Sequence, residues 1–550
     1  MSSPGTQALA EMPHSEDSLT NRAAIAQEAA AAVDNEHHMG FFKSLKLYKK
    51  ACFWSIFLST CVIMEGFDMV MLNNLYAYTP FARKFGSLQA DGTYGLSAQW
   101  QSGLSGGSQA GQILRLFLTG IVADRYGYRK SLIGALVACI CFIFIIFFSE
   151  ILVQLLVGEI LIGIPWGLFQ TTTTTYAAEV CPVHLRAYLT TYINACWVFG
   201  QLFASGIMRA MLSHNDEWGY RIPFALQWIW PVPLIIGISL APESPWWLVR
   251  GNRIQQARKS LERLTTPSRE VAFDADESIS MMIHTNEMEK RIEAGVSFLD
   301  LFKKANLRRT EIVCVTMMIQ GGTGSTLQSY STYFYEQAGM ATDNAFDMTI
   351  GQYGMGLLGT LVAWSLISRY GRRTLYLSGL LTNGMVLFAI GGTALAGRDN
   401  TSASWAIGSL LLISTFVYDC IVGPVCYSLV SELSSTRLRT KTIAFARNMY
   451  NCVCLITSVL TPKMLNPTAW NWGAKTAFLW AGSCFICAIW TYFRLPEPKG
   501  RTFAELDILF EEGVKARDFS KTAVNHIDTH VSETSVVGGE TVRHEKKSSE

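Results

Sequence analysis

The sequence is poor in charge. Only 16% of its 550 residues are charged, whereas 50% are hydrophobic, and the mean hydropathy is +0.22. Soluble chains carry about 25% charged residues. The charged residues here gather in both tails, in 250–311 and in short clusters, so long uncharged stretches remain between them. A membrane-spanning helix requires roughly 20 mostly apolar residues, and the chain is therefore predicted to be an all-α membrane protein with many spans.

Signals of several other function classes are also missing. The net charge is +2, and the basic residues form no stripe that would fit nucleic acid. The 13 cysteines stand in apolar segments without the paired spacing of a zinc or redox site, so no metal site is expected. No nucleophile and base stand in a pattern typical of an enzyme. We therefore expect neither catalysis nor an organic cofactor.

Twelve apolar stretches are long enough to cross a bilayer. They are 51–75, 101–123, 131–149, 151–178, 190–211, 222–241, 310–336, 349–367, 374–396, 404–430, 441–462 and 475–494. Basic residues precede the first stretch and occupy alternate loops, which by the positive-inside rule places both termini in the cytoplasm. The predicted order is a disordered tail (1–50), a six-helix bundle (51–241), a cytoplasmic linker with short helices (242–309), a second bundle (310–495) and a C-terminal tail (496–550).

Three sequence clusters recur in the two halves of the chain. ADRYGYRK at 123–130 is matched by SRYGRRT at 368–374, and PESPWW at 242–247 by PEPKGR at 496–501. Glu179 precedes Arg186 by seven residues, just as Glu432 precedes Arg439. Ordered matches at nearly one offset predict two pseudo-symmetric six-helix bundles, the layout of a parallel-repeat secondary transporter.

Each repeated cluster falls at a predicted cytoplasmic helix end. We expect acidic side chains there to face arginines across the interface between the bundles and to close the cytoplasmic side. The alternative is that the basic residues only fix the topology. The candidate gate residues are Asp124, Arg125, Arg129, Glu179, Arg186, Arg369, Arg372, Glu432 and Arg439.

These clusters also carry a resemblance to a known family. Together with GFD at 66–68, YAAEVCPVHLR at 176–186 and GPVCYSLVSEL at 423–433, they resemble the sugar porter family of the major facilitator superfamily over about 51–510. GEILIGIPWGLFQ at 158–170, LTTYINACWVFGQL at 189–202 and YSTYFYEQAGM at 330–340 resemble the fungal α-glucoside (maltose-type) permeases in particular. The resemblance implies the twelve-helix major facilitator fold, a monomer, and proton symport of an oligosaccharide across a fungal plasma membrane.

A sugar site requires amides, hydroxyls and aromatic faces, because sugar hydroxyls both donate and accept and the CH faces stack on rings. The resemblance assigns substrate binding to Asn194, Gln201, Gln320, Thr326, Tyr330, Tyr427 and Asn448. Gln201 and Tyr330 could equally pack helices together. Thr326 and Tyr427 replace the Asn and Trp that hexose carriers usually have, which leaves the identity of the sugar open.

Four charged residues, Glu65, Asp68, Glu159 and Arg447, stand at membrane depth, where charge is expensive and tends to mark proton pathways. Glu65 and Asp68 share a helix face at i and i+3, and close carboxylates in a dry site do not both ionise easily. The resemblance matches Asp68 to a first-span proton carrier. We expect Arg447 to be the positively charged partner that Asp68 or Glu65 lets go when the acid is protonated. A static buried ion-pair network is the alternative. Gln112 stands where maltose-type carriers usually have Glu.

The predicted function is thus proton-coupled uptake of an α-glucoside or related oligosaccharide, with protons as the coupling ion. One alternative is the same fold carrying a hexose, a polyol or a secondary metabolite, by uniport or efflux. The other is a sugar sensor that binds without transporting.

Overall fold

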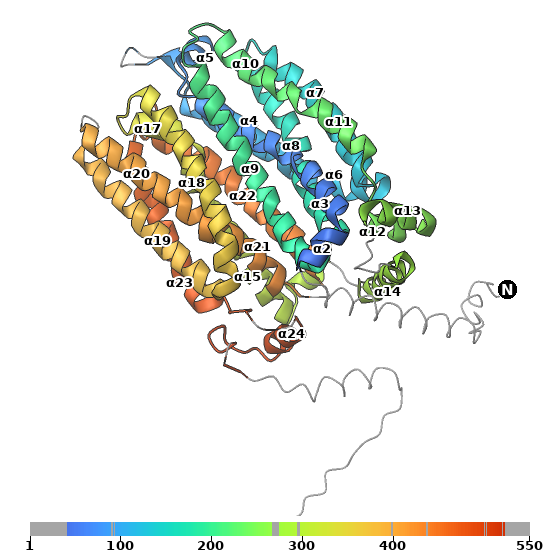
Figure 1. Cartoon of the computed structure of the whole chain (residues 1–550). Helices are drawn as coiled ribbons and strands as arrows, with labels where there is room; N and C mark the ends of the chain where they lie inside the picture. The colour runs from blue at the N-terminus through green and yellow to red at the C-terminus, as the bar shows by residue number, and fades with distance from the viewer. Residues whose placement is uncertain are drawn as a thin grey trace, which may run out of the picture.

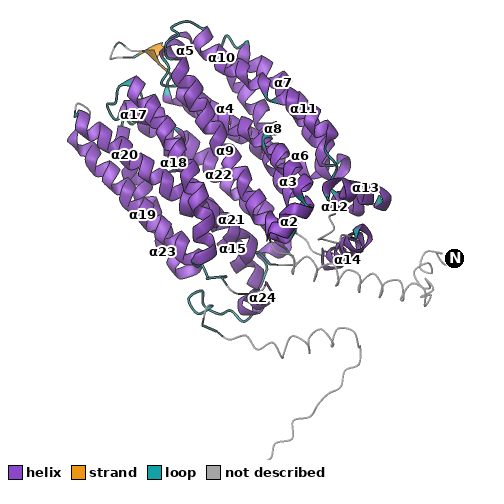
Figure 2. Ribbon diagram, in the orientation of Figure 1, coloured by secondary structure: helices purple, strands orange, loops and turns teal. Residues whose placement is uncertain are grey.

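The protein is described by a computed structural model over residues 41–89, 92, 94–266, 274–293, 298–397, 400–435, 438–499, 501, 503–519 and 521–522. The predicted tails over 1–40 and 523–550 lie outside these residues. Long helices run side by side along one axis (Figure 1), and within the described part β1 (Ser87–Leu88) and β2 (Tyr94–Gly95) form the one hairpin (Figure 2). The predicted all-α class is confirmed.

Each predicted span corresponds to one long helix or to a row of shorter ones. The first six are α3 (Lys49–Ser59) with α4 (Cys61–Leu75), α6 (Ala98–Tyr126), α7 (Tyr128–Phe147), α8 (Leu152–Val180), α9 (Val183–Met211), and α10 (Trp218–Leu226) with η1 (Gln227–Ile229) and α11 (Pro231–Leu240). The last six are α15 (Lys304–Gly322) with α16 (Ser325–Ser329) and α17 (Ser331–Gln337), α18 (Thr342–Arg369), α19 (Arg372–Thr393), α20 (Thr401–Val417) with η4 (Tyr418–Val422) and α21 (Gly423–Leu433), α22 (Arg439–Leu465), and α23 (Ala477–Arg494).

Nine of these spans are long and apolar enough to cross a membrane, as judged within the described residues. The row from α15 to α17, with α6 and α9, completes the predicted twelve. Thr60 interrupts the first span, where its hydroxyl donates to the Phe57 carbonyl over 2.6 Å. Gly324 interrupts the seventh with φ +90°. In the tenth, the π-turn η4 is followed by Gly423 and then Pro424, which cannot donate a helical hydrogen bond.

The remaining helices mark the two ends of the molecule. Figure 1 shows α2 (Phe41–Leu47), α12 (Pro245–Arg250), α13 (Ile254–Leu264), α14 (Ala275–Glu293) and α24 (Phe503–Glu511) at one end, which we call the inner end. α5 (Thr79–Phe85), α10 and α17 lie at the opposite, outer end. These names follow the predicted orientation. The first and last described helices share the inner end, in line with termini on one side of the membrane.

Two segments that were assigned to the tails are folded instead. Residues 41–50 form α2 and the start of α3, with Ser44 and Leu47 buried. In the C-terminal tail, α24 buries Leu506, Leu509 and Phe510. The apolar side chains of α24 pack into the core of the second bundle, whereas α2 buries Ser44 and Leu47 and leaves Phe42 and Leu45 exposed.

The repeated PE clusters act as helix caps. Glu243 accepts a hydrogen bond from the backbone N–H of Tyr128 (3.1 Å), at the start of α7. Glu497 accepts from the backbone N–H of Arg372 (2.9 Å), at the start of α19. The first N–H groups of a helix have no intrahelical acceptor, and its N-terminus favours negative charge. A Cβ at Gly127 would lie 2.6 Å from a Glu243 carboxylate oxygen, so the glycine of each RYG cluster makes room for the cap.

Close backbone packing joins α4 to α9. A Cβ on Gly66 would overlap the Trp197 carbonyl oxygen, and one on Gly200 would overlap the Ile63 carbonyl oxygen. Small residues let helix backbones approach in a membrane protein. The glycine of GFD therefore fixes the depth and rotation of α4, and with them the position of Asp68 two residues later.

We predict that Gly66→Ala destabilises the protein whereas Gly103→Ala does not. The first methyl group meets a backbone carbonyl that cannot move without shifting α9; the second meets nothing within 4 Å. Overpacking of this kind costs about 1–3 kcal/mol. The measurement is the midpoint of thermal unfolding of each variant in detergent, with size-exclusion chromatography used to follow the loss of folded protein. Equal midpoints would contradict the packing argument.

Candidate substrate and proton site

Two carboxyls lie buried inside the first bundle. Asp68 on α4 is 1% exposed, and its Oδ1 accepts a hydrogen bond from Gln227 Nε2 of η1 over 2.7 Å. Its Oδ2 has no hydrogen-bond partner among the described residues. Glu159 on α8 is fully buried, and neither of its oxygens has such a partner. Glu159 lies within electrostatic reach of Asp68. Charging both groups in an apolar interior would be costly, so this pair can hold a proton.

Glu65 is buried on the same helix but has different neighbours. Its Oε1 accepts from Gln112 Nε2 of α6 over 3.4 Å. Asp68 therefore contacts η1 while Glu65 contacts α6. The two acids were predicted to share a helix face as a close pair, but they contact different helices, and the electrostatic neighbour of Asp68 is Glu159 on α8. Gln112 occupies the place of the usual acid and keeps the contact with Glu65 as a neutral amide.

Arg447 belongs to the second bundle and reaches the first. It lies on α22, where its Nη1 donates to the Tyr427 hydroxyl (3.1 Å) and its Nη2 donates to the side-chain oxygen of Gln170 on α8. The guanidinium also lies over the Tyr450 ring, 4.8 Å from the ring centroid. Glu65 is within electrostatic reach. The predicted positive charge thus lies within electrostatic reach of one candidate acid, Glu65, and the hydrogen bonds from its Nη1 and Nη2 go to neutral side chains.

Three of the predicted sugar ligands are held by contacts within the protein. Gln320 Nε2 donates to the Gly423 carbonyl (2.9 Å), which joins the seventh span to the tenth. The Thr326 hydroxyl donates to that of Thr457 (2.9 Å). Tyr330 is buried and stacks on Tyr76 with the ring centroids 6.0 Å apart. Among the three, the Tyr330 hydroxyl is buried without a hydrogen-bond partner among the described residues.

The other four predicted sugar ligands lie in both bundles. Tyr427 is 43% exposed, and the Asn448 Oδ1 is buried without a hydrogen-bond partner among the described residues. Asn194 on α9 is half-buried and Gln201 on the same helix is buried. An amide oxygen that lacks a donor is the kind of group that a sugar hydroxyl satisfies.

The predicted gate residues are paired differently from expectation. Glu179 accepts from Arg250 of α12, from Ser244 and from the Tyr128 hydroxyl (2.9 Å). Glu432 lies 3.3 Å from Arg372. Both ion pairs stay within one half of the chain, so they do not join the bundles here. They fix the inner ends of helices within each bundle.

The remaining gate residues take separate positions. Arg125 is exposed over the Tyr126 ring, the Arg129 backbone N–H contributes to the Glu243 cap, the Arg369 carbonyl accepts from Lys499, and Arg439 is half-buried at the start of α22. The side chains of Asp124 and Arg186 lie outside the described part of the structure.

The two bundles are joined at the outer end. Arg209 of α9 lies 2.7 Å from Asp347 and 3.1 Å from Asp343 of α18. Further bonds between the bundles run from Asn73 to the Ser329 carbonyl (3.1 Å), from Thr332 to Asn74 (2.7 Å), from Ser102 to the Val459 carbonyl (2.9 Å) and from Asn466 to the Leu96 carbonyl (2.8 Å). The outer side of the interface is therefore closed in this structure.

Three polar residues at membrane depth were not predicted as site residues. Asp419 lies in η4, where a Cβ on Gly356 of α18 would come within 2.6 Å of its Oδ2. Asp419 stands in an apolar run, so the rule that charged residues within apolar runs mark functional sites, which identified Glu65, would have identified Asp419 as well. Gln170 and Gln227 carried no such signal, since a neutral amide in a long helix usually packs.

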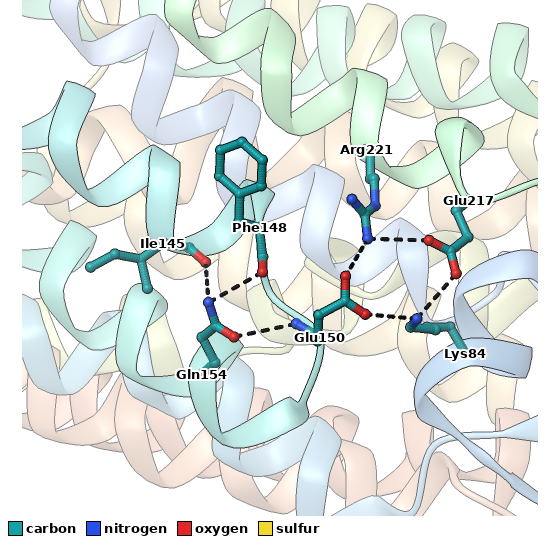
Figure 3. Close-up of polar contacts among 7 residues, drawn as sticks. All are labelled: Lys84, Ile145, Phe148, Glu150, Gln154, Glu217 and Arg221. Atoms are coloured by element: carbon teal, nitrogen blue, oxygen red, sulfur yellow. Dashed lines mark hydrogen bonds and ion pairs between the residues drawn. The ribbon is translucent and has the colours of Figure 1, made fainter.

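An ion network ties the outer ends of the first bundle together (Figure 3). Lys84 Nζ lies 2.8 Å from Glu150 and 3.1 Å from Glu217, and Arg221 lies 2.7 Å from Glu150 and 3.1 Å from Glu217. The network joins α5, the α7–α8 loop and α10. The hydrogen bond from Lys84, followed by that from Arg221, lowers the pKa of the Glu150 carboxyl.

Comparison with known proteins gives a consistent result. A family model described as "Sugar (and other) transporter" matches residues 54–510. A general alpha-glucoside permease of Saccharomyces cerevisiae is 44% identical over 94% of this chain and 84% of its own length. Maltose permease MAL61 of Saccharomyces cerevisiae is 45% identical over 91% and 82%. An inward open structure of the E. coli xylose transporter XylE covers 83% of this chain and 98% of its own, with a TM-score of 0.67 at 20% identity.

We predict that the network around Glu150 survives external acidity. Because the folded-state pKa of Glu150 is lowered, its ion pairs stabilise the folded protein at every pH above the ordinary glutamate pKa of about 4.3. This stabilisation is lost only as the pH falls through the lower folded-state pKa. Glu150→Gln should therefore lower the thermal midpoint at neutral and mildly acidic pH, with the gap closing in strong acid or high salt. A gap that does not depend on salt would show that the charges are not the cause.

Proposed function

Because the chain belongs to the family of sugar (and other) transporters, we propose that it carries an α-glucoside or related oligosaccharide into the cell together with a proton. The observation that carries this proposal is the identity of 44% and 45%, over 94% and 91% of the chain, to permeases named for α-glucosides and maltose. The chain is a multi-pass membrane transporter and not an enzyme. We place it in the plasma membrane as a monomer, with both termini in the cytoplasm.

The geometry supports a site between the bundles. Asn194 and Gln201 come from the first bundle, and Gln320, Tyr427 and Asn448 from the second, so a sugar bound by both sets would follow their relative movement. Alternating access requires the outer and inner sides of such an interface to open in turn. The outer side is held by the bonds around Arg209, which must break before a sugar enters from outside.

We assign the coupling proton to Asp68 and Glu159. Asp68 Oδ2 and both Glu159 oxygens lack hydrogen-bond partners among the described residues, and a proton shared by the pair removes the cost of a second charge. Glu65 hydrogen-bonds to Gln112, a neutral amide that neither accepts nor releases a proton in transport. Coupling therefore does not depend on an acid at position 112.

The test is uptake in yeast that lacks its own sugar transporters. Maltose, trehalose, turanose and glucose are compared at acidic and neutral external pH with a pH electrode in the medium. We expect the α-glucosides to enter and to alkalinise the medium, more strongly when it is acidic. Uptake of glucose alone, or entry of every sugar without alkalinisation, would overturn the proposal.

Asp68→Asn should abolish accumulation while sugar counterflow continues. The amide keeps a hydrogen-bonding side chain beside Gln227 but cannot ionise, so it neither binds nor releases a proton in the transport cycle, and the carrier equilibrates sugar without concentrating it. The control is Asp216→Asn, which removes a carboxylate from an exposed outer loop and should accumulate sugar normally. Accumulation that survives in Asp68→Asn would remove this residue from the coupling mechanism.

A further inference from the structure

Gln170 and Arg447 join the two bundles away from the closed outer end. α22 starts at the inner end, and Arg447 follows its first residue, Arg439, by eight positions, about 12 Å along the helix. α8 ends at Val180 near the inner end, and Gln170 precedes that residue by ten positions, about 15 Å. The contact therefore lies in the inner half of both helices.

Arg447 depends on this contact for its solvation. A guanidinium stays charged under all ordinary conditions and offers five N–H donors. Within its own bundle, the Arg447 guanidinium contacts the Tyr427 hydroxyl and the Tyr450 ring. Its Nη2 donates to the Gln170 side-chain oxygen of the other bundle. Separating the bundles here takes that acceptor away from a half-buried guanidinium, and a donor that loses its acceptor away from bulk water is costly.

The chemistry of the acceptor suits a contact that must break in each cycle. A carboxylate at position 170 would form a buried ion pair, which is far costlier to separate than an amide–guanidinium hydrogen bond because it leaves two uncompensated charges. An alanine would leave the Nη2 donor with no partner from the first bundle. A glutamine gives a contact of intermediate strength, which is strong enough to hold Arg447 and weak enough to break in each cycle.

We propose that the hydrogen bond between Gln170 and Arg447 is the inner latch of the carrier. Gln170 is a positioning residue: it draws the guanidinium across the interface, and that closes the route from the sugar site to the inner side. This inference rests on the proposed function. Tyr427, a candidate sugar ligand, binds the same guanidinium, and Glu65 lies within its electrostatic reach. Movement of Arg447 therefore changes the surroundings of both the sugar site and the first span.

Hydrogen–deuterium exchange of the full chain in lipid nanodiscs tests the latch without any sugar. A hydrogen bond to a charged group favours the closed state by about tenfold or more. Gln170→Ala should therefore speed exchange about tenfold at the inner ends of α8 and α22 and slow it at the outer ends of α4 and α17. Gln170→Glu should slow exchange at the inner ends instead.

The matched control is Gln154→Ala on the same helix. Gln154 Nε2 donates to the Ile145 and Phe148 carbonyls within its own bundle (Figure 3), so its loss should leave the inner ends unchanged. Where Gln170→Ala does not fold, Gln170→Asn gives the same comparison, because its shorter amide falls short of Arg447. Equal exchange in all variants, or changes of the same sign for Ala and Glu, would overturn the latch.

Transport assays separate this inference from the proposed function. With an intact latch mechanism, Gln170→Glu should slow net uptake and counterflow alike, whereas Gln170→Ala should raise the KM for external sugar. Suppose that exchange shifts in opposite directions in Gln170→Ala and Gln170→Glu, but the unmodified chain transports none of the tested sugars. This result would support the latch and refute the proposed substrate. Normal transport in every variant, with unchanged exchange, would refute the latch alone.

Discussion

A charge in the hydrocarbon core of a bilayer costs about 3 kcal/mol or more unless the protein supplies partners for it. Arg447 obtains its partners from both bundles, through Tyr427 on one side and Gln170 on the other. Asp68 has one donor, Gln227, and Glu159 has none among the described residues. The same constraint therefore produces two devices. The permanent cation links the bundles, and the acids, which can be neutralised, are the groups to which we assign the coupling proton.

These charges act together only because the helices are held at fixed depth. The close contact of Gly66 with α9 sets the height of α4, and the Glu243 and Glu497 caps hold the first turns of α7 and α19. Each bundle is thus stiff at its inner end. A stiff bundle transmits a local change in charge as movement of the whole interface, whereas a soft one would absorb it by rearranging side chains.

Apolar run lengths, basic loops and internal repeats were sufficient to predict twelve spans in two bundles, because those signals come from the bilayer and not from tertiary packing. The partners of individual charges were not predictable in the same way. Glu179 pairs with Arg250 of the linker, which a spacing rule within one motif cannot reveal. Asp419 was within reach of the rule for charges in apolar runs. Gln170 and Gln227 were not, since the resemblance assigns neither a role, unlike Gln201 and Gln320, and their contacts are visible only in the structure.

Gln112 shows how such a site tolerates the loss of an acid. Glu65, Asp68 and Glu159 with Arg447 would leave a formal charge of −2 if all were ionised, and a fourth acid at position 112 would make it −3. The interior cannot hold that excess, so some carboxyls must be protonated in either case. The amide at position 112 donates a hydrogen bond to Glu65 and adds no further negative charge. Under the proposed assignment, the coupling proton belongs to Asp68 and Glu159, where no amide has taken an acid's place.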